Sequence, residues 1–153
     1  MGVPGRGIFG GRTLFPDHSL NPGSCWAQIS LWSVFCSTTG LTAAFRSSAF
    51  FNPEAFGNWR RDSVREVDII SGCFLLLERS LWQELDGFDL RFHMYGEDAD
   101  LCLRAGRLGA RCVMNPDATI DHYGGASEAV RARREEDKSE LQSQSIPVFR
   151  LMI

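Results

Sequence analysis

The second half of the chain has the most regular pattern of apolar and polar positions. Residues 68–80 contain a nearly continuous apolar run, which is typical of a strand buried on both faces. Residues 97–108 predict a helix that ends at Gly109. Two further strands are predicted, residues 110–116 stopped by a proline and residues 118–123 stopped by two glycines. This order of elements favours an α/β or α+β fold.

A short helix is predicted between the first strand and the longer helix. Ser80 should begin it, because Gln83 three residues later completes a capping-box pattern, and Gly87 should end it. Leu81 and Leu85 are four residues apart and should therefore face the core together.

The first 66 residues are less regular. Residues 1–25 are rich in glycine and proline and predict a loop with many turns. Residues 26–45 predict a partly buried helix that is broken near Gly40, and residues 46–66 predict an irregular connection. Beyond residue 127 the chain is highly charged and predicts a solvated helix.

One glycine motif in the first segment has a functional interpretation. Residues 5–10 match G-x-G-x-x-G, but a dinucleotide-binding fingerprint must follow a strand, and only four residues precede Gly5. A flexible loop is therefore the favoured interpretation.

Composition narrows the class of protein. At 153 residues the chain is the size of one domain, and its net charge of −3 argues against a general nucleic-acid partner. Its five cysteines are odd in number and form no C-x-x-C pair, which favours reduced thiols and a cytosolic location. The longest apolar run, residues 69–77, is about half of what a membrane-spanning helix needs, and the N-terminus predicts no signal peptide.

The helix predicted over residues 97–108 separates its acidic side chains. One stripe holds an i,i+4 pair that contributes a few tenths of a kcal/mol on a surface; the stripe comprises Glu97, Asp100, Arg104 and Arg107. Asp98 instead lies on the inward face with Leu101, Cys102 and Ala105, where burial is costly unless the carboxylate is hydrogen-bonded or opens into a cleft. A simple helix cap remains an alternative role for Asp98. Asp98 and Asp100 form a D-x-D, but a helix turns them about 160° apart, which disfavours a shared metal.

An ordered series of motifs between residues 67 and 127 resembles a known family. The series is V-D-x-x-S-G at 67–72, G-F-D at 87–89, M-Y-G-E-D-A-D-L-C-L-R at 94–104, P-x-A-x-x-x-H at 116–122 and G-G-x-S at 124–127. It is similar to the C-terminal half of the family 2 glycosyltransferases, and most similar to their rhamnosyltransferase-like members. The resemblance implies an α/β chain with a partial GT-A-like (nucleotide-diphospho-sugar transferase) fold, in which helices flank a short mixed sheet.

The resemblance also implies roles for individual residues. Asp98 would be the catalytic base that accepts the proton of the acceptor hydroxyl, with Glu97 beside it. Three residues would bind the acceptor, namely Tyr95, His93 and Asp68. His122 would be a ligand of a donor-bound Mn²⁺ or Mg²⁺, although a hydrogen-bonded core histidine is an equally good interpretation.

The implied activity is inverting transfer of a sugar from a nucleoside-diphosphate sugar to a glycan or lipid-linked acceptor, as in cell-wall polysaccharide biosynthesis. The enzyme would be cytoplasmic, working at the inner face of the membrane. The donor-binding β-α-β half and its D-x-D are not recognisable, which predicts a truncated form. The alternative is a non-catalytic interaction module that pairs through an exposed sheet edge, for instance as a homodimer. We divide the chain into a lead-in segment (1–66), the C-terminal half of the catalytic domain (67–127) and a charged helical tail (128–153).

Overall fold

The structure is a computed structural model that describes residues 6–92 and 96–123. The strands are β1 (Gly7–Leu14), β2 (Leu20–Asn21), β3 (Cys25–Trp26), β4 (Arg65–Val67), β5 (Ile69–Ile70), β6 (Leu75–Leu77) and β7 (Arg111–Asp121). The helices are α1 (Leu31–Thr38), α2 (Leu41–Ala44), α3 (Arg79–Glu84), α4 (Glu97–Arg107) and the short 3₁₀ helix η1 (Pro22–Ser24). No helix among these residues is both long enough and apolar enough to span a bilayer.

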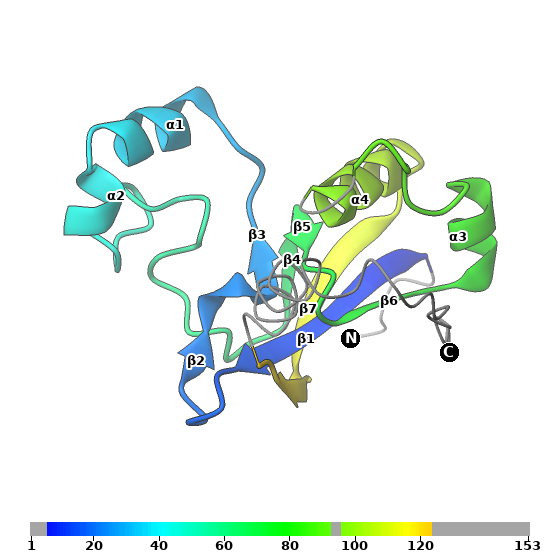
Figure 1. The fold of residues 1–153 in the computed structure, drawn as a ribbon, viewed down its shortest axis with the longest axis horizontal. Helices are drawn as coiled ribbons and strands as arrows, with labels where there is room; N and C mark the ends of the chain where they lie inside the picture. The colour runs from blue at the N-terminus through cyan, green and yellow to red at the C-terminus, as the bar shows by residue number, and fades with distance from the viewer. Residues whose placement is uncertain (1–5, 93–95, 124–153) are drawn as a thin grey trace, which may run out of the picture. The chain divides into compact units, whose positions relative to one another are not determined.

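β1 is the centre of a mixed sheet (Figure 1). It pairs in parallel with β7 and antiparallel with β2 and β6, while β4 adds to the far side of β7 in antiparallel orientation. β3 and β5 form a separate two-stranded antiparallel sheet. Helix α4 packs against β5 and β7. The predicted fold class, an α/β chain with helices beside a short mixed sheet, is confirmed.

The prediction of a loop over the first 25 residues is wrong for β1. Its glycines lie where neighbouring groups leave no room for a side chain. A Cβ on Gly10 would lie 2.5 Å from the Ile70 Cγ2 atom, and one on Gly11 would lie 2.3 Å from the Phe74 ring. The glycine motif at residues 5–10 therefore enters the central strand, and the part that is described, from Gly7 on, is no dinucleotide-binding turn.

The apolar run at residues 68–80 is also not one strand. β5 and β6 belong to different sheets, and a turn at residues 71–74 separates them. The Ser71 N–H donates to the Ser24 carbonyl at 3.0 Å, and the Phe74 N–H donates back to the Ser71 carbonyl at 3.3 Å. These bonds turn the chain between the two sheets, which an apolar pattern alone cannot signal.

The two strands predicted over residues 110–123 are a single strand, β7. Its register with β1 shifts between the pairs Gly11–Asn115 and Arg12–Thr119. Pro116 lies in the extra residues of this irregularity, where its missing N–H breaks no ladder hydrogen bond. The proline interrupts the pairing without ending the strand.

The helices predicted within the described residues are confirmed, with one correction at a cap, and the helix predicted beyond residue 127 lies outside the described residues. Gly40, at a φ of 80°, separates α1 from α2, and Gly109, at a φ of 79°, follows α4. Helix α3 begins after Glu78 without a side-chain cap, so the capping box predicted from Ser80 is wrong. The Ser80 hydroxyl instead donates to the Glu78 carboxylate at 3.2 Å.

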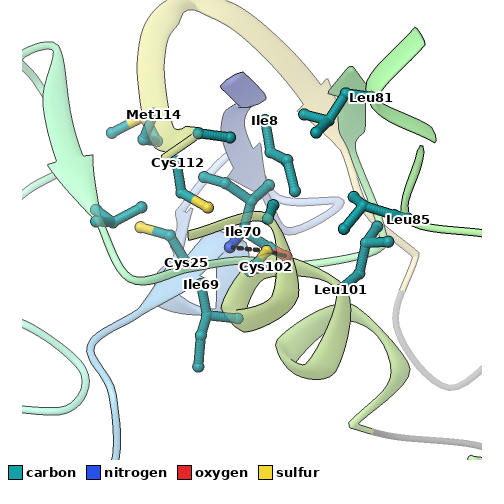
Figure 2. Close-up of a cluster of buried hydrophobic side chains, with 13 residues drawn as sticks. Ile8, Cys25, Ile69, Ile70, Leu81, Leu85, Leu101, Cys102, Cys112 and Met114 are labelled. Carbon is teal, nitrogen blue, oxygen red and sulfur yellow. Dashed lines mark hydrogen bonds between the residues drawn. The ribbon is translucent and has the colours of Figure 1, made fainter. Parts of the chain in front are cut away.

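The core lies between the sheets, α3 and α4 (Figure 2). The predicted inward faces are confirmed: Leu81 of α3 and Leu85 at its C-cap are buried, as are the α4 residues Leu101, Cys102 and Ala105. The Ile70 N–H donates to the Cys102 Sγ atom at 3.4 Å, which ties α4 to β5 (Figure 2). All five cysteines are unpaired.

Candidate functional site

The first turn of α4 holds the acidic side chains predicted to matter. Gly96, at a φ of 100°, is its N-cap and provides no side-chain hydrogen bond. Glu97, Asp98 and Asp100 follow in the first turn, where the positive end of the helix dipole favours negative charge. The three carboxylates differ in their hydrogen-bond partners.

Asp98 bridges its helix and the turn between β5 and β6. Its Oδ2 atom accepts a hydrogen bond from the Gly72 N–H at 2.9 Å, and its Oδ1 atom accepts one from the Ala99 N–H at 2.8 Å. The residue is half-buried, and Gly72 is exposed. The bond to Ala99 is cap-like, but a bond to a residue 26 positions away is more than helix capping. Asp98 is thus a fixed carboxylate whose surroundings remain open on the Gly72 side.

Glu97 has a different environment from its neighbour. Its Oε2 atom is buried and has no hydrogen-bond donor among the described residues. A buried carboxylate oxygen without a donor is unfavourable unless another group supplies one. The two acids of the Glu-Asp pair are therefore not equivalent.

Asp100 and Arg104 form the predicted i,i+4 pair, with 2.7 Å between the Arg104 Nε and Asp100 Oδ2 atoms. The same guanidinium also donates to the carbonyls of Leu85 and Gly87, at 2.6 and 2.8 Å. Arg104 thus fastens α4 to the chain that leaves α3, a structural role in keeping with its expected position away from the chemistry.

The segment after α3 leads towards the predicted acceptor residues. Arg91 hydrogen-bonds the Asp89 carboxylate through its side chain and backbone, and these bonds lower the pKa of Asp89 to about 2. Phe88 meets Trp82 edge to face, with 5.1 Å between the ring centroids. His93 and Tyr95, predicted to bind the acceptor, lie outside the described residues.

Asp68 lies between β4 and β5 and is exposed. Its Oδ2 atom accepts a hydrogen bond from the Gln28 N–H at 2.7 Å, which connects it to the chain between β3 and α1. Among the described residues, no hydrogen bond joins Asp68 to Asp98. The structure therefore places Asp68 against Gln28 and Asp98 against Gly72.

His122 follows the end of β7 and is half-buried. Its backbone N–H donates to the Leu14 carbonyl at 2.8 Å, and its ring Nδ1 atom lies 3.5 Å from the side-chain amide nitrogen of Asn21. Within residues 6–92 and 96–123, no three His, Cys, Asp or Glu side chains gather where they could hold a metal ion. These residues do not fit a complete metal site, and the contact with Asn21 suits a hydrogen-bonded histidine.

Sequence reasoning missed two features of this region. Gly72 donates to the candidate base, and the S-G pair of the motif was the available signal. Arg61 is fully buried although it lies in a segment expected to be an irregular connection. Nothing in its local sequence distinguishes it from the adjacent, exposed Arg60.

The sequence matches the family described as Glycosyltransferase like family 2 over residues 26–138. It is 43% identical over 61 residues to N-acetylglucosaminyl-diphospho-decaprenol L-rhamnosyltransferase of Mycobacterium tuberculosis, a stretch covering 40% of this chain and 20% of that protein. It is 40% identical over 57 residues to Rhamnosyltransferase WbbL of Escherichia coli, covering 37% and 22%. It is 32% identical over 91 residues to O-antigen biosynthesis protein RfbC of Myxococcus xanthus, covering 60% and 6%.

The matched stretches thus span about a fifth or less of these curated relatives. No solved structure matches the chain. The family match covers more than half of the sequence and includes α4 with its acidic first turn. The chain is therefore a member of the family 2 glycosyltransferases, of the rhamnosyltransferase-like kind.

Proposed function

We propose that this chain serves the acceptor side of an inverting glycosyl transfer, in which Asp98 is the general base. The observation that carries the proposal is the Asp98 carboxylate, held by the N–H groups of Gly72 and Ala99 and open towards the exposed glycine. Family membership supports a sugar transferase, and a nucleoside-diphosphate sugar is the donor that such an enzyme uses.

The proposed step is a single displacement. The acceptor hydroxyl attacks the anomeric carbon, its proton passes to an Asp98 oxygen, and the bond to the diphosphate breaks with its electron pair leaving on the nucleotide. A carboxylate has about four acceptor positions, so the two backbone bonds leave room for a hydroxyl. Base catalysis of this kind contributes on the order of 10²–10⁴-fold. Glu97 would stay beside the base.

The acceptor is proposed to be a lipid-linked glycan. The printed name of the M. tuberculosis relative specifies a sugar carried on diphospho-decaprenol, which supports this class. His93, Tyr95 and Asp68 remain proposed contacts of the acceptor sugar. We propose that the reaction takes place at the cytosolic face of a membrane.

Members of this family generally use a divalent metal. His122 would offer one imidazole ligand, and the described residues supply no others beside it. We therefore assign no step of the reaction to a metal held by these residues alone.

Transfer from UDP- and dTDP-sugars to a sugar linked to polyprenyl diphosphate tests the proposal, with Mn²⁺ added. Asp98→Asn should lower transfer by about 10²–10⁴-fold. The control is Asp100→Asn, a carboxylate of the same turn that is paired with Arg104 and should retain transfer within a few-fold. Circular dichroism shows whether each variant folds. Transfer by a folded Asp98→Asn variant at the wild-type rate would exclude Asp98 as the base.

A further inference from the structure

Helix α1 exposes its apolar side chains and buries its small ones. Ser33 and Cys36 face inward, whereas Leu31 is 92% exposed and Phe35 is 50% exposed. A helix on the surface of a globular protein normally has the opposite arrangement. The outward face of α1 is therefore suited to an apolar partner.

An aromatic patch continues this face. It comprises Trp32, Phe35, Phe45, Phe50 and Phe51. Neighbouring rings are 4.9 to 5.4 Å apart between centroids, and the Trp32 Nε1–H donates to the Phe50 carbonyl at 2.7 Å. The patch is held in place by its own contacts, although four of its five rings are more than a third exposed. Residues 19–45, which include α1, contain no charged side chain.

A cavity of about 930 Å³ lies on the other side of α1, between α1, α2 and residues 52–61. Ser33 and Ser37 of α1 line it, as do three arginines, Arg46, Arg60 and Arg61. Glu54 is the one acidic side chain in its lining. The excess of positive charge suits an anionic ligand.

Arg61 is the deepest of these cations, with no exposed surface. Its guanidinium donates at 2.9 to 3.3 Å to the backbone carbonyls of Pro22, Cys25, Ala55 and Trp59. The Arg61 Nε atom is buried and has no acceptor among the described residues. Carbonyls satisfy N–H groups without neutralising the charge, so the wall of the cavity contains a cation without a carboxylate partner there.

A second hollow lies beside residues of the cavity and of the aromatic patch. Its volume is about 450 Å³, and it shares Ala43, Arg46 and Ser47 with the basic cavity. It adds Phe45, which belongs to the patch. Cationic and aromatic surfaces are therefore contiguous through Arg46.

We propose that this surface binds the diphosphate of a lipid-linked acceptor in the basic cavity and the first part of its prenyl chain on α1 and the aromatic patch. The proposal rests on the proposed function, which supplies the class of acceptor. A nucleoside diphosphate shares the anionic group but lacks an apolar chain, and the uncharged face of α1 favours the lipid.

Farnesyl diphosphate, titrated into the full chain, is the probe, and tryptophan fluorescence is the readout because Trp26 and Trp59 line the cavity. Inorganic diphosphate, farnesol, UDP and dTDP are titrated in parallel. Farnesyl diphosphate should bind more tightly than each of them, because it alone has both the diphosphate and the chain.

Two variants separate the anionic and apolar contributions. Replacing Arg46 and Arg60 together by glutamine should weaken the binding of farnesyl diphosphate by about tenfold or more and leave the binding of farnesol unchanged. Leu31→Ser should weaken the binding of farnesyl diphosphate by roughly three- to tenfold and leave the binding of inorganic diphosphate unchanged. All three substituted residues are exposed, so the variants should fold. The controls are Arg107→Gln and Leu76→Ser, exposed positions that line neither hollow.

Three results would overturn the proposal: no binding of farnesyl diphosphate, equal losses in the control variants, or binding of UDP or dTDP as tight as that of farnesyl diphosphate. The last result would assign the cavity to a nucleotide instead. The proposed function can fail without the lipid site failing. Binding of farnesyl diphosphate that depends on Arg46, Arg60 and Leu31 would support the lipid site even if transfer did not depend on Asp98.

Discussion

Replacing Arg104 by methionine tests how the end of α3 is fastened to α4. The guanidinium makes three hydrogen bonds, to the Asp100 carboxylate and to the carbonyls of Leu85 and Gly87, at 2.6 to 2.8 Å. Methionine keeps a long, flexible apolar stem and removes all three donors. The substitution therefore measures the polar contacts with little change in packing volume.

The size of the effect distinguishes two descriptions of Arg104. If only the surface pair with Asp100 mattered, the loss would be about 0.3–0.5 kcal/mol. Hydrogen bonds from a charged donor to the two carbonyls add about 1.5–3 kcal/mol each when they are buried. The Arg104 side chain is 24% exposed, so water replaces part of this contribution. We expect Arg104→Met to lower the free energy of unfolding by roughly 2–4 kcal/mol.

Urea denaturation followed by circular dichroism measures the change. Asp100→Asn removes only the ion pair and should lower the free energy of unfolding by about 0.5 kcal/mol. Arg107→Met is the matched control, an exposed arginine of the same helix. An Arg104→Met variant within about 0.5 kcal/mol of that control would show that the two carbonyl contacts do not stabilise the fold.

Two further predictions concern local packing. Gly10→Ala should lower the free energy of unfolding by about 1–3 kcal/mol, because the added Cβ would overlap Ile70. Gly72→Ala should change the free energy of unfolding by less than about 0.5 kcal/mol. Urea denaturation compares the two variants, and equal effects would contradict the packing of β1. Cys73 is the one cysteine that is not buried, so a thiol reagent should label one site rapidly in the folded protein and all five after unfolding. Mass spectrometry of the labelled peptides identifies the site, and rapid labelling of Cys102 would show that α4 detaches from β5.

The helix that contains the Glu-Asp pair could be predicted in detail because its information is local. A period of 3.6 residues places Leu101, Cys102 and Ala105 on one face, and the structure buries all three. The same period places Asp98 beside that face, where its carboxylate reaches Gly72. The helix and its inward face follow from this one pattern, whereas the role of Asp98 as a base is what the family resemblance implies.

The central strand could not be predicted in the same way. β1 has three glycines among its eight residues, a composition that local preferences assign to turns. It is a strand because it pairs with β2, β6 and β7, and it contains glycines because Ile70 and Phe74 occupy the space that side chains at positions 10 and 11 would need. Arg61 was missed for a related reason, since its burial depends on carbonyls up to 39 positions away. Such contacts have no signature in the neighbouring sequence.

Gly10 and Gly72 lack a side chain for different reasons, the packing of β1 at Gly10 and the space beside Asp98 at Gly72. At Gly10 a Cβ would lie 2.5 Å from Ile70, so the glycine is required for β1 to pack. At Gly72 a Cβ would lie 3.7 Å from the Asp98 Cβ atom and 3.8 Å from Oδ2, distances of ordinary contact, so folding does not require glycine there. A side chain at position 72 would nevertheless stand beside the Asp98 carboxylate on its open side. We therefore expect that glycine at position 72 leaves space for an acceptor beside the proposed base, while its N–H holds the Asp98 carboxylate in place.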